Sequence, residues 1–199
     1  MPAVPGRRVK GDEAMTRGTK SLLFGVHQFA LHPLFVLLAW RKLYRSWPSP
    51  AQLVAIVIHD WGYWGSPDMD GDRGRDHPFR SSDAWARLCT WWPFYWLPEA
   101  FVEAVDNEVR YHSRHACHLL DVRPSRLCWA DKLAFVFYPR EFYILLGTLS
   151  GELDEYMSRA IADGWLKYTD TPADWFNQVK AYMTLVSQNE LMPSQIEDI

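Results

Sequence analysis

The sequence predicts an all-α fold, and three observations favour this class. Sustained apolar–polar alternation and the Asn-Gly pair of tight hairpins, both typical of strands, are missing from it. Apolar residues instead recur at helical spacing, as in Phe101, Val105 and Val109. Helix-start signals recur as a residue followed by proline: Ser49-Pro50, His77-Pro78, Leu97-Pro98, Arg123-Pro124 and Thr171-Pro172. We therefore expect seven to nine helices.

The length of 199 residues suits one domain with a sizeable core. Residues 1–20 lack the apolar stretch of a signal peptide and are expected to form a flexible leader. The helical domain is expected over residues 21–190, and a C-terminal tail over 191–199. Segment Ser21–Trp40 is apolar but contains His27 and His32, which are costly in a bilayer. It is expected to form a buried core helix and not a transmembrane segment.

Composition excludes some functions and leaves others open. The net charge of -3 gives no electrostatic footprint for nucleic acid. Three scattered cysteines, Cys89, Cys117 and Cys128, indicate reduced thiols and a cytoplasmic location. The aromatic block Trp91–Phe101 is expected to pack in the core between two helices. A membrane-surface patch or a surface for homo-oligomerisation is the alternative for this block.

Polar residues on apolar helical faces or at helix starts are the candidates for a metal site. Burying a carboxylate costs several kcal/mol of folding free energy unless it is paired or bound to a metal. We therefore expect these groups to lie together and to bind a common metal site. Histidine nitrogen and carboxylate oxygen suit a divalent Mn, Fe, Co, Ni or Zn ion. One metal would use four of the groups, and all six would hold two metals bridged by Asp60. The candidate ligands are His32, His59, Asp60, His77, His112 and Asp131.

Alternatives remain for three of these histidines. His27 competes with His32 as the first ligand, and the aligned Val36 favours His32. His77 could serve only as a helix cap before Pro78. His112 and His115 are three residues apart and could face one site, which favours His112 as ligand and His115 as a nearby phosphate or proton contact.

The order of these residues resembles the HD-domain metal-dependent phosphohydrolase superfamily. Five segments carry the resemblance in order, between about residues 24 and 137: "HPLFVLLA", "LVAIVIHDWGY", "HPFRSSDAWARL", "VRYHSRH" and "LCWADKLAF". The resemblance implies a helical bundle with a central metal site. It also implies hydrolysis of a small phosphomonoester or phosphodiester, such as a nucleotide, by metal-activated hydroxide, with Asp60 as a catalytic residue. His115 is expected to be the second catalytic residue, because its position near His112 would let it handle protons.

Two departures narrow the resemblance to the six-ligand, two-metal branch. Alarmone hydrolases and bacterial nucleoside monophosphatases of this superfamily carry a glutamate shortly after the HD pair, where this chain has Trp61 to Trp64. The HHE and GYP motifs of cyclic-di-GMP enzymes are also missing from the sequence. The remaining branch includes diadenosine tetraphosphate hydrolases and diiron oxygenases that cleave inositol or phosphonates. A diiron oxygenase and a non-catalytic module with a structural metal therefore stay as alternatives.

Basic residues near the candidate ligands are expected to bind the phosphate, because guanidinium and ammonium groups match its oxygens. These residues are Arg80, Arg114 and Lys132. The long segment from Gly62 to Asp76 is expected to form a lid over the metal site. Its acidic run lacks the glutamate that an EF-hand needs, which argues against a calcium loop.

Overall fold

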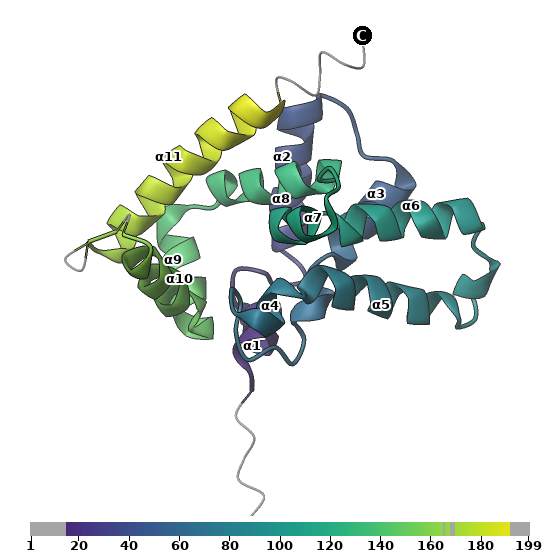
Figure 1. Cartoon of the computed structure of the whole chain (residues 1–199), viewed down its shortest axis with the longest axis horizontal. Helices are drawn as coiled ribbons and strands as arrows, with labels where there is room; N and C mark the ends of the chain where they lie inside the picture. Colours follow the sequence, from purple (N-terminus) through teal and green to yellow (C-terminus); the bar gives the residue numbers. More distant parts are fainter. Residues whose placement is uncertain (1–14, 165, 168–169, 192–199) are drawn as a thin grey trace, which may run out of the picture.

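The computed structural model describes residues 15–164, 166–167 and 170–191. Over these residues the chain forms helices and no strand, which confirms the all-α prediction (Figure 1). The α-helices are α1 (Arg17–Phe24), α2 (His32–Tyr44), α3 (Pro50–Ile58), α4 (Asp72–Arg75), α5 (His77–Cys89), α6 (Glu99–Arg110), α7 (Arg114–Leu120), α8 (Arg126–Ala134), α9 (Arg140–Ser150), α10 (Glu152–Ala162) and α11 (Pro172–Leu191). Three single-turn 3-10 helices are η1 (Trp61–Tyr63), η2 (Phe94–Trp96) and η3 (Phe135–Phe137).

Several predicted boundaries were wrong. The eleven described α-helices exceed the predicted seven to nine, because α4 and α7 are short pieces within segments expected to be loop or to continue a helix. Helix α1 begins at Arg17, so the predicted leader extends too far by four residues. Residues 1–14 of that leader and residues 192–199 of the predicted tail lie outside the described residues.

The segment Ser21–Trp40 forms two helices and not the single core helix that was predicted. Helix α1 ends at Gly25, whose N–H bonds to the carbonyls of Lys20 and Ser21. A Cβ atom at Gly25 would lie 2.6 Å from Glu152 Oε1, so the close approach of this turn to α10 requires glycine. Helix α2 then begins seven residues later, at His32. Among the described helices, none is long and apolar enough to cross a membrane.

The residue–proline signals located some helix starts better than others. Ser49 caps α3 in a capping box with Gln52, and Thr171 exchanges hydrogen bonds with Asp174 at the start of α11. The helix starts predicted at Leu97-Pro98 and Arg123-Pro124 lie too early in the chain, since α6 begins at Glu99 and α8 at Arg126.

The described residues form three clusters of buried apolar side chains, and the two larger ones make up most of the core. The first joins α2, α3, α6 and α8 through buried residues such as Trp40, Ile56 and Val109. The second joins α9, α10 and α11 through residues such as Leu153 and Phe176. Phe35 of α2 packs against both clusters, which puts the start of α2 between them. Helices α5 and α6 lie side by side and extend together away from the rest of the bundle (Figure 1).

Candidate metal centre

Six predicted site residues converge from five parts of the chain. Four of them stand at or just beyond a helix end: His32 begins α2, His59 follows α3, His77 begins α5 and His112 follows α6. Asp60 follows His59, and Asp131 lies within α8. All are buried except Asp131, which is partly exposed. The chain therefore brings four imidazoles and two carboxylates into one interior position.

Three of the histidines are oriented by the same local bond. The Nδ1 atoms of His59, His77 and His112 each bond to a backbone carbonyl three residues earlier in the chain. The acceptors are the carbonyl oxygens of Ile56, Gly74 and Val109. A carbonyl can only accept, so each Nδ1 carries a proton and each ring points its Nε2 inward, with a free lone pair when the ring is neutral.

The fourth histidine is oriented by Tyr138, the residue that follows η3. His32 Nδ1 lies 3.3 Å from the Tyr138 hydroxyl, which itself donates to the Val26 carbonyl at 2.7 Å. Because the Tyr138 hydroxyl proton is already donated to Val26, the hydroxyl oxygen accepts a hydrogen bond from His32 Nδ1. His32 Nε2 therefore also points inward. Sequence reasoning missed Tyr138, which is 106 residues away from His32 in the chain.

The inward-facing atoms form two groups. In the first, His32 Nε2 lies 3.3 Å from His59 Nε2 and 3.0 Å from Asp131 Oδ1. In the second, the Nε2 atoms of His77 and His112 lie 2.9 Å apart. Lone pairs that face one another at these distances repel unless a cation or a shared proton lies between them. The donor set and its tautomers therefore suit a divalent transition metal.

Asp60 connects the two groups through its two oxygens. Its Oδ2 lies 3.2 Å from His59 Nε2 and 3.3 Å from His32 Nε2. Its Oδ1 faces the other pair, 3.7 Å from His77 Nε2 and 3.9 Å from His112 Nε2. Oδ2 is buried and makes no hydrogen bond, an expensive condition for a carboxylate oxygen without a cation. The buried groups can therefore hold a metal ion, and Asp60 faces both pairs of imidazoles.

The protonation of the cluster is uneven. Burial opposes protonation of His59, but the carboxylates of Asp60 and Asp131 outweigh it and raise its pKa to about 10. Burial and the neighbouring charge on His59 lower the pKa of His112 to about 4. Burial also opposes ionisation of Asp60, yet the surrounding imidazoles hold its pKa well below the ordinary value. Without metal, the cluster thus keeps a proton on His59, and a metal ion must displace that proton.

A glycine and a serine tie the two histidine groups together. A Cβ atom at Gly62 would lie 2.0 Å from the His77 carbonyl oxygen, so only glycine permits this contact. The Gly62 N–H donates to Ser81 Oγ at 2.7 Å, and Ser81 Oγ donates to the His59 carbonyl at 2.5 Å. The start of α5 is thereby fixed against the segment that follows His59.

His27 lies beside the cluster and is bound to a buried glutamate. Its Nδ1 is 3.0 Å from Glu152 Oε2, and its ring centroid is 5.3 Å from that of His32. Glu152 is fully buried and also accepts from the Val26 N–H and the hydroxyls of Ser21 and Ser150. Of the two candidates for the first ligand, His32 is the one that faces His59 and Asp131. Sequence reasoning missed Glu152, because no local pattern marks it as a partner of His27.

A cavity of about 370 Å³ opens beside the first group. His27, His32 and Asp131 form part of its lining, together with Lys132. Its other walls come from α9, α10, α11 and η3 and are largely aromatic: Phe135, Tyr138, Tyr143, Tyr156 and Trp175. Arg159, Asp70 and Asp163 add charges of both signs. The cavity can therefore receive a molecule with a polar end near the candidate ligands and an apolar or aromatic body.

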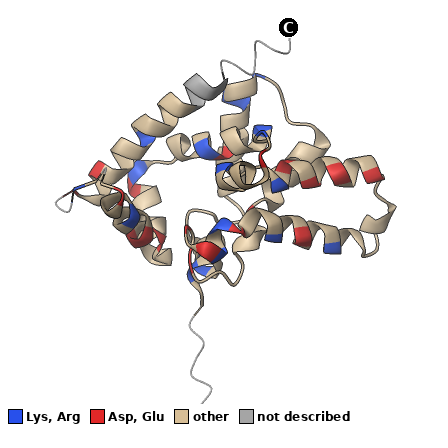
Figure 2. Ribbon diagram, in the orientation of Figure 1, with Lys and Arg blue, Asp and Glu red and all other residues tan. Residues whose placement is uncertain are grey.

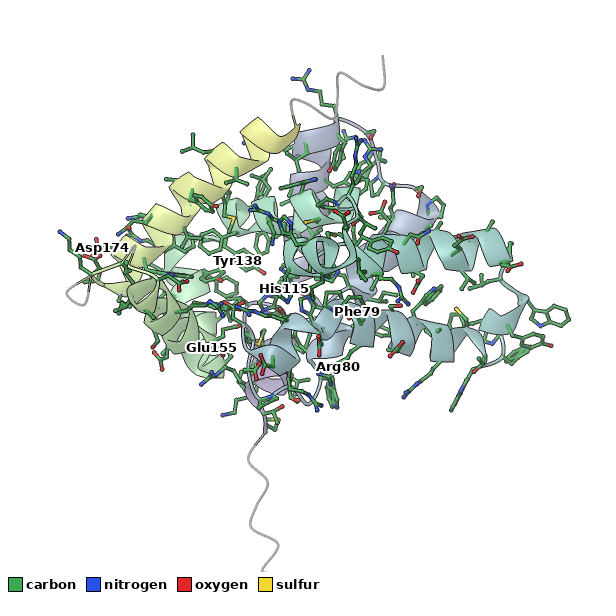
Figure 3. All side chains as sticks on the ribbon, in the orientation of Figure 1. Phe79, Arg80, His115, Tyr138, Glu155 and Asp174 are labelled. Atoms are coloured by element: carbon green, nitrogen blue, oxygen red, sulfur yellow. The ribbon has the colours of Figure 1, made fainter. Side chains whose placement is uncertain are left out.

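The other predicted site residues are distributed differently. Lys132 lines the cavity, but neither Arg80 nor Arg114 is among the residues that line it. Arg80 lies on the α5 side (Figure 3) and donates from Nη2 to the Trp64 carbonyl at 2.5 Å. His115 is exposed on α7 and belongs to neither group of residues that could hold a metal ion. A spacing of three residues puts His112 and His115 on one face only within a continuous helix, whereas α6 ends at Arg110 and α7 begins at Arg114.

The segment expected to form a lid is anchored by hydrogen bonds and burial. Glu155 of α10 accepts from the backbone N–H groups of Met69 and Asp70, and Met69 is 1% exposed. Asp68 accepts from the Gly74 N–H at 2.6 Å. Asp70 lines the cavity, so this segment contributes part of the wall beside the candidate metal centre.

Comparison with known proteins gives no relative from which a role could be transferred: no family model, curated protein or solved structure matches the chain.

Proposed function

We propose that the chain is a metal-dependent phosphohydrolase of the HD type, acting on a small phosphomonoester or phosphodiester. The observation that supports this most is the position of Asp60, whose two oxygens each face a separate pair of imidazole nitrogens. Pairs of metal ions bridged in this way are common in enzymes that hydrolyse phosphate esters. Bound divalent metals would supply Lewis acidity and lower the pKa of a coordinated water toward neutrality.

The residues of the cavity suggest how a substrate would be held. Lys132 stands next to Asp131 in α8 and can place an ammonium group beside the phosphoryl oxygens. Arg159 is held at the cavity wall by its hydrogen bond to the Asp70 carbonyl at 2.8 Å. The aromatic walls from η3, α9 and α11 would receive the organic part of the ester and exclude water around it.

The test starts with the metal content of the protein as isolated, measured by elemental analysis. Metal-depleted protein is then reloaded with Mn, Co, Ni, Fe or Zn and assayed for phosphate release from a panel of phosphomonoesters and phosphodiesters. We expect turnover in at least one metallated form and none after Asp60→Asn. A Lys132→Gln variant should retain its metal and show a raised KM, because Lys132 contacts the substrate and not the ligand cluster.

Two outcomes would overturn the proposal. One is the absence of phosphate release in every metallated form. The other is about two iron atoms per chain with oxygen consumption and no hydrolysis, which would favour an oxygenase that uses the same six side chains.

A further inference from the structure

The connection between α5 and α6 exposes a group of aromatic rings, here called the aromatic tip. It covers residues 90–98, at the end of the helical pair that extends from the bundle (Figure 1). Its exposed rings are Trp91 at 71%, Trp92 at 76%, Phe94 at 37%, Tyr95 at 52% and Trp96 at 70%. The prediction that this block packs in the core was therefore wrong.

The backbone of the aromatic tip is ordered by its own hydrogen bonds. The N–H groups of Phe94 and Tyr95 bond to the Trp91 carbonyl at 2.7 and 3.1 Å, and the Leu97 N–H bonds to the Phe94 carbonyl at 3.0 Å. Leu88, just before the tip, and Leu97, near its end, pack against the first apolar cluster. The exposed rings thus stand on a fixed turn whose two ends are anchored in the core.

The charge pattern around the aromatic tip argues against a highly charged partner. No residue from Thr90 to Pro98 carries a formal charge, and the loop is uniformly tan in Figure 2. The nearest charged side chains on the two helices are Asp83, Arg87, Glu99 and Glu103, three acids and one base. Such a surface lacks the basic residues that would attract nucleic acid or anionic lipid. The uncharged aromatic tip therefore suits a partner whose surface has no net charge.

The size and composition of the tip favour a bilayer over a second copy of the chain. Its five exposed fractions amount to about three full rings, or roughly 450–750 Å² of aromatic surface. That is at or above the ~300–600 Å² of the largest apolar patch on a typical monomer, but it falls short of the ~800 Å² per partner that a stable protein interface buries. Tryptophan and tyrosine are enriched where lipid headgroups meet acyl chains, because their rings are apolar and carry one polar group.

We propose that the aromatic tip inserts into the headgroup–acyl boundary of a lipid bilayer with zwitterionic headgroups. Trp91, Trp92 and Trp96 are the anchoring residues, and the protein binds as a peripheral protein through this turn. Insertion at the end of the α5–α6 pair leaves the cavity lined by α8, α10 and α11 outside the bilayer. This binding is independent of the proposed hydrolysis.

The test is vesicle binding by the full-length protein, measured by sedimentation with phosphatidylcholine vesicles and by quenching of tryptophan fluorescence with brominated lipid. The triple variant Trp91→Gln, Trp92→Gln, Trp96→Gln should lower the partition coefficient at least tenfold. Its helical circular dichroism and metal content should match the unaltered protein, since all three rings are exposed. Trp47→Gln is the matched control, because Trp47 is 69% exposed but lies between α2 and α3. It should change binding less than twofold.

Three results would overturn the proposal. The first is failure of the unaltered protein to bind phosphatidylcholine vesicles. The second is binding that appears only with anionic phosphatidylserine and disappears at 0.5 M salt, which would contradict the charge argument. The third is a concentration-dependent dimer in sedimentation velocity that the triple variant abolishes, which would make a second copy of the chain the occupant of the tip.

Discussion

Replacing His27 by glutamine should destabilise the metal-free protein by an amount that shrinks as the pH rises. His27 forms an ion pair with Glu152, which is 0% exposed and whose Oε2 lies 3.0 Å from His27 Nδ1. Burial opposes protonation of His27, but the carboxylates of Asp60 and Glu152 outweigh it and raise its pKa from 6.5 to about 9. The folded chain therefore holds a proton on His27 that the unfolded chain releases near pH 6.5.

The size of the effect follows from this difference between the folded and unfolded pKa values. A group whose pKa is raised on folding contributes stability that is fully present below pH 6.5 and is lost as the pH rises through about 9. At about 1.4 kcal/mol per pKa unit, His27 contributes about 3 kcal/mol at pH 6. We expect His27→Gln to lower the free energy of unfolding by about 3 kcal/mol at pH 6, which corresponds to roughly 6–12 °C in Tm for a domain of this size.

The measurement is urea unfolding, followed by circular dichroism, in the presence of a chelator at pH 6, 7.5 and 9.5. The difference in unfolding free energy between the two proteins should fall below about 1 kcal/mol at the highest pH. His118→Gln is the matched control, because His118 is exposed on α7 and should give no difference at any pH. A difference that stays constant, or that grows with pH, would refute the assigned charge on His27.

Four further predictions test the metal centre and its supports. Asp60→Asn should lower the metal bound per chain by more than half in elemental analysis, since both Asp60 oxygens face imidazole nitrogens. Metal affinity, titrated by calorimetry, should rise by up to about tenfold per pH unit between pH 6 and 8, because the metal displaces the proton held by His59. Gly62→Ala should cost about 1–3 kcal/mol of unfolding free energy, because its methyl group would overlap the His77 carbonyl. Ser49→Ala should cost about 1 kcal/mol through loss of the α3 cap, measured by urea unfolding.

Controls for these predictions come from exposed positions of the same residue types. Asp83→Asn on the exposed face of α5 should leave the metal content unchanged. Gly65 has a φ of 74° and no atom within 4 Å of an added Cβ, so Gly65→Asn should change stability by less than Gly62→Ala does. Equal metal content in the Asp60 and Asp83 variants would contradict the bridging role of Asp60, and a pH-independent affinity would contradict the protonated His59.

Local signals in the sequence were enough to predict the helical class and several helix starts. The capping boxes at Ser49 and Thr171 are short-range features, and the chain forms both. The break between α1 and α2 could not be found in this way. It depends on Gly25 approaching Glu152, which is 127 residues further along the chain, and apolar spacing alone favours continuing the helix through this turn.

Contacts between distant segments also explain what was missed around the candidate site. Spacing favours His32 over His27 as the first ligand but leaves His27 without an assigned partner, and that partner, Glu152, is found only in the fold. Likewise, the composition of the aromatic block is compatible with a core or a surface. Its exposure is decided by how far the α5–α6 pair extends beyond its neighbours, which no pattern within residues 90–98 records.

The positions of the histidines at helix ends explain how this centre can be buried at little cost. The last four carbonyls of a helix have no partner within that helix. Ile56, Gly74 and Val109 each lie in the last turn of α3, α4 or α6, and each carbonyl accepts from the Nδ1 of a histidine three residues later. One imidazole thereby satisfies a helix terminus and fixes its own Nε2 toward the centre. Had these histidines stood in helix interiors, each would have needed another buried polar group as a partner, so the helix breaks are themselves part of the site.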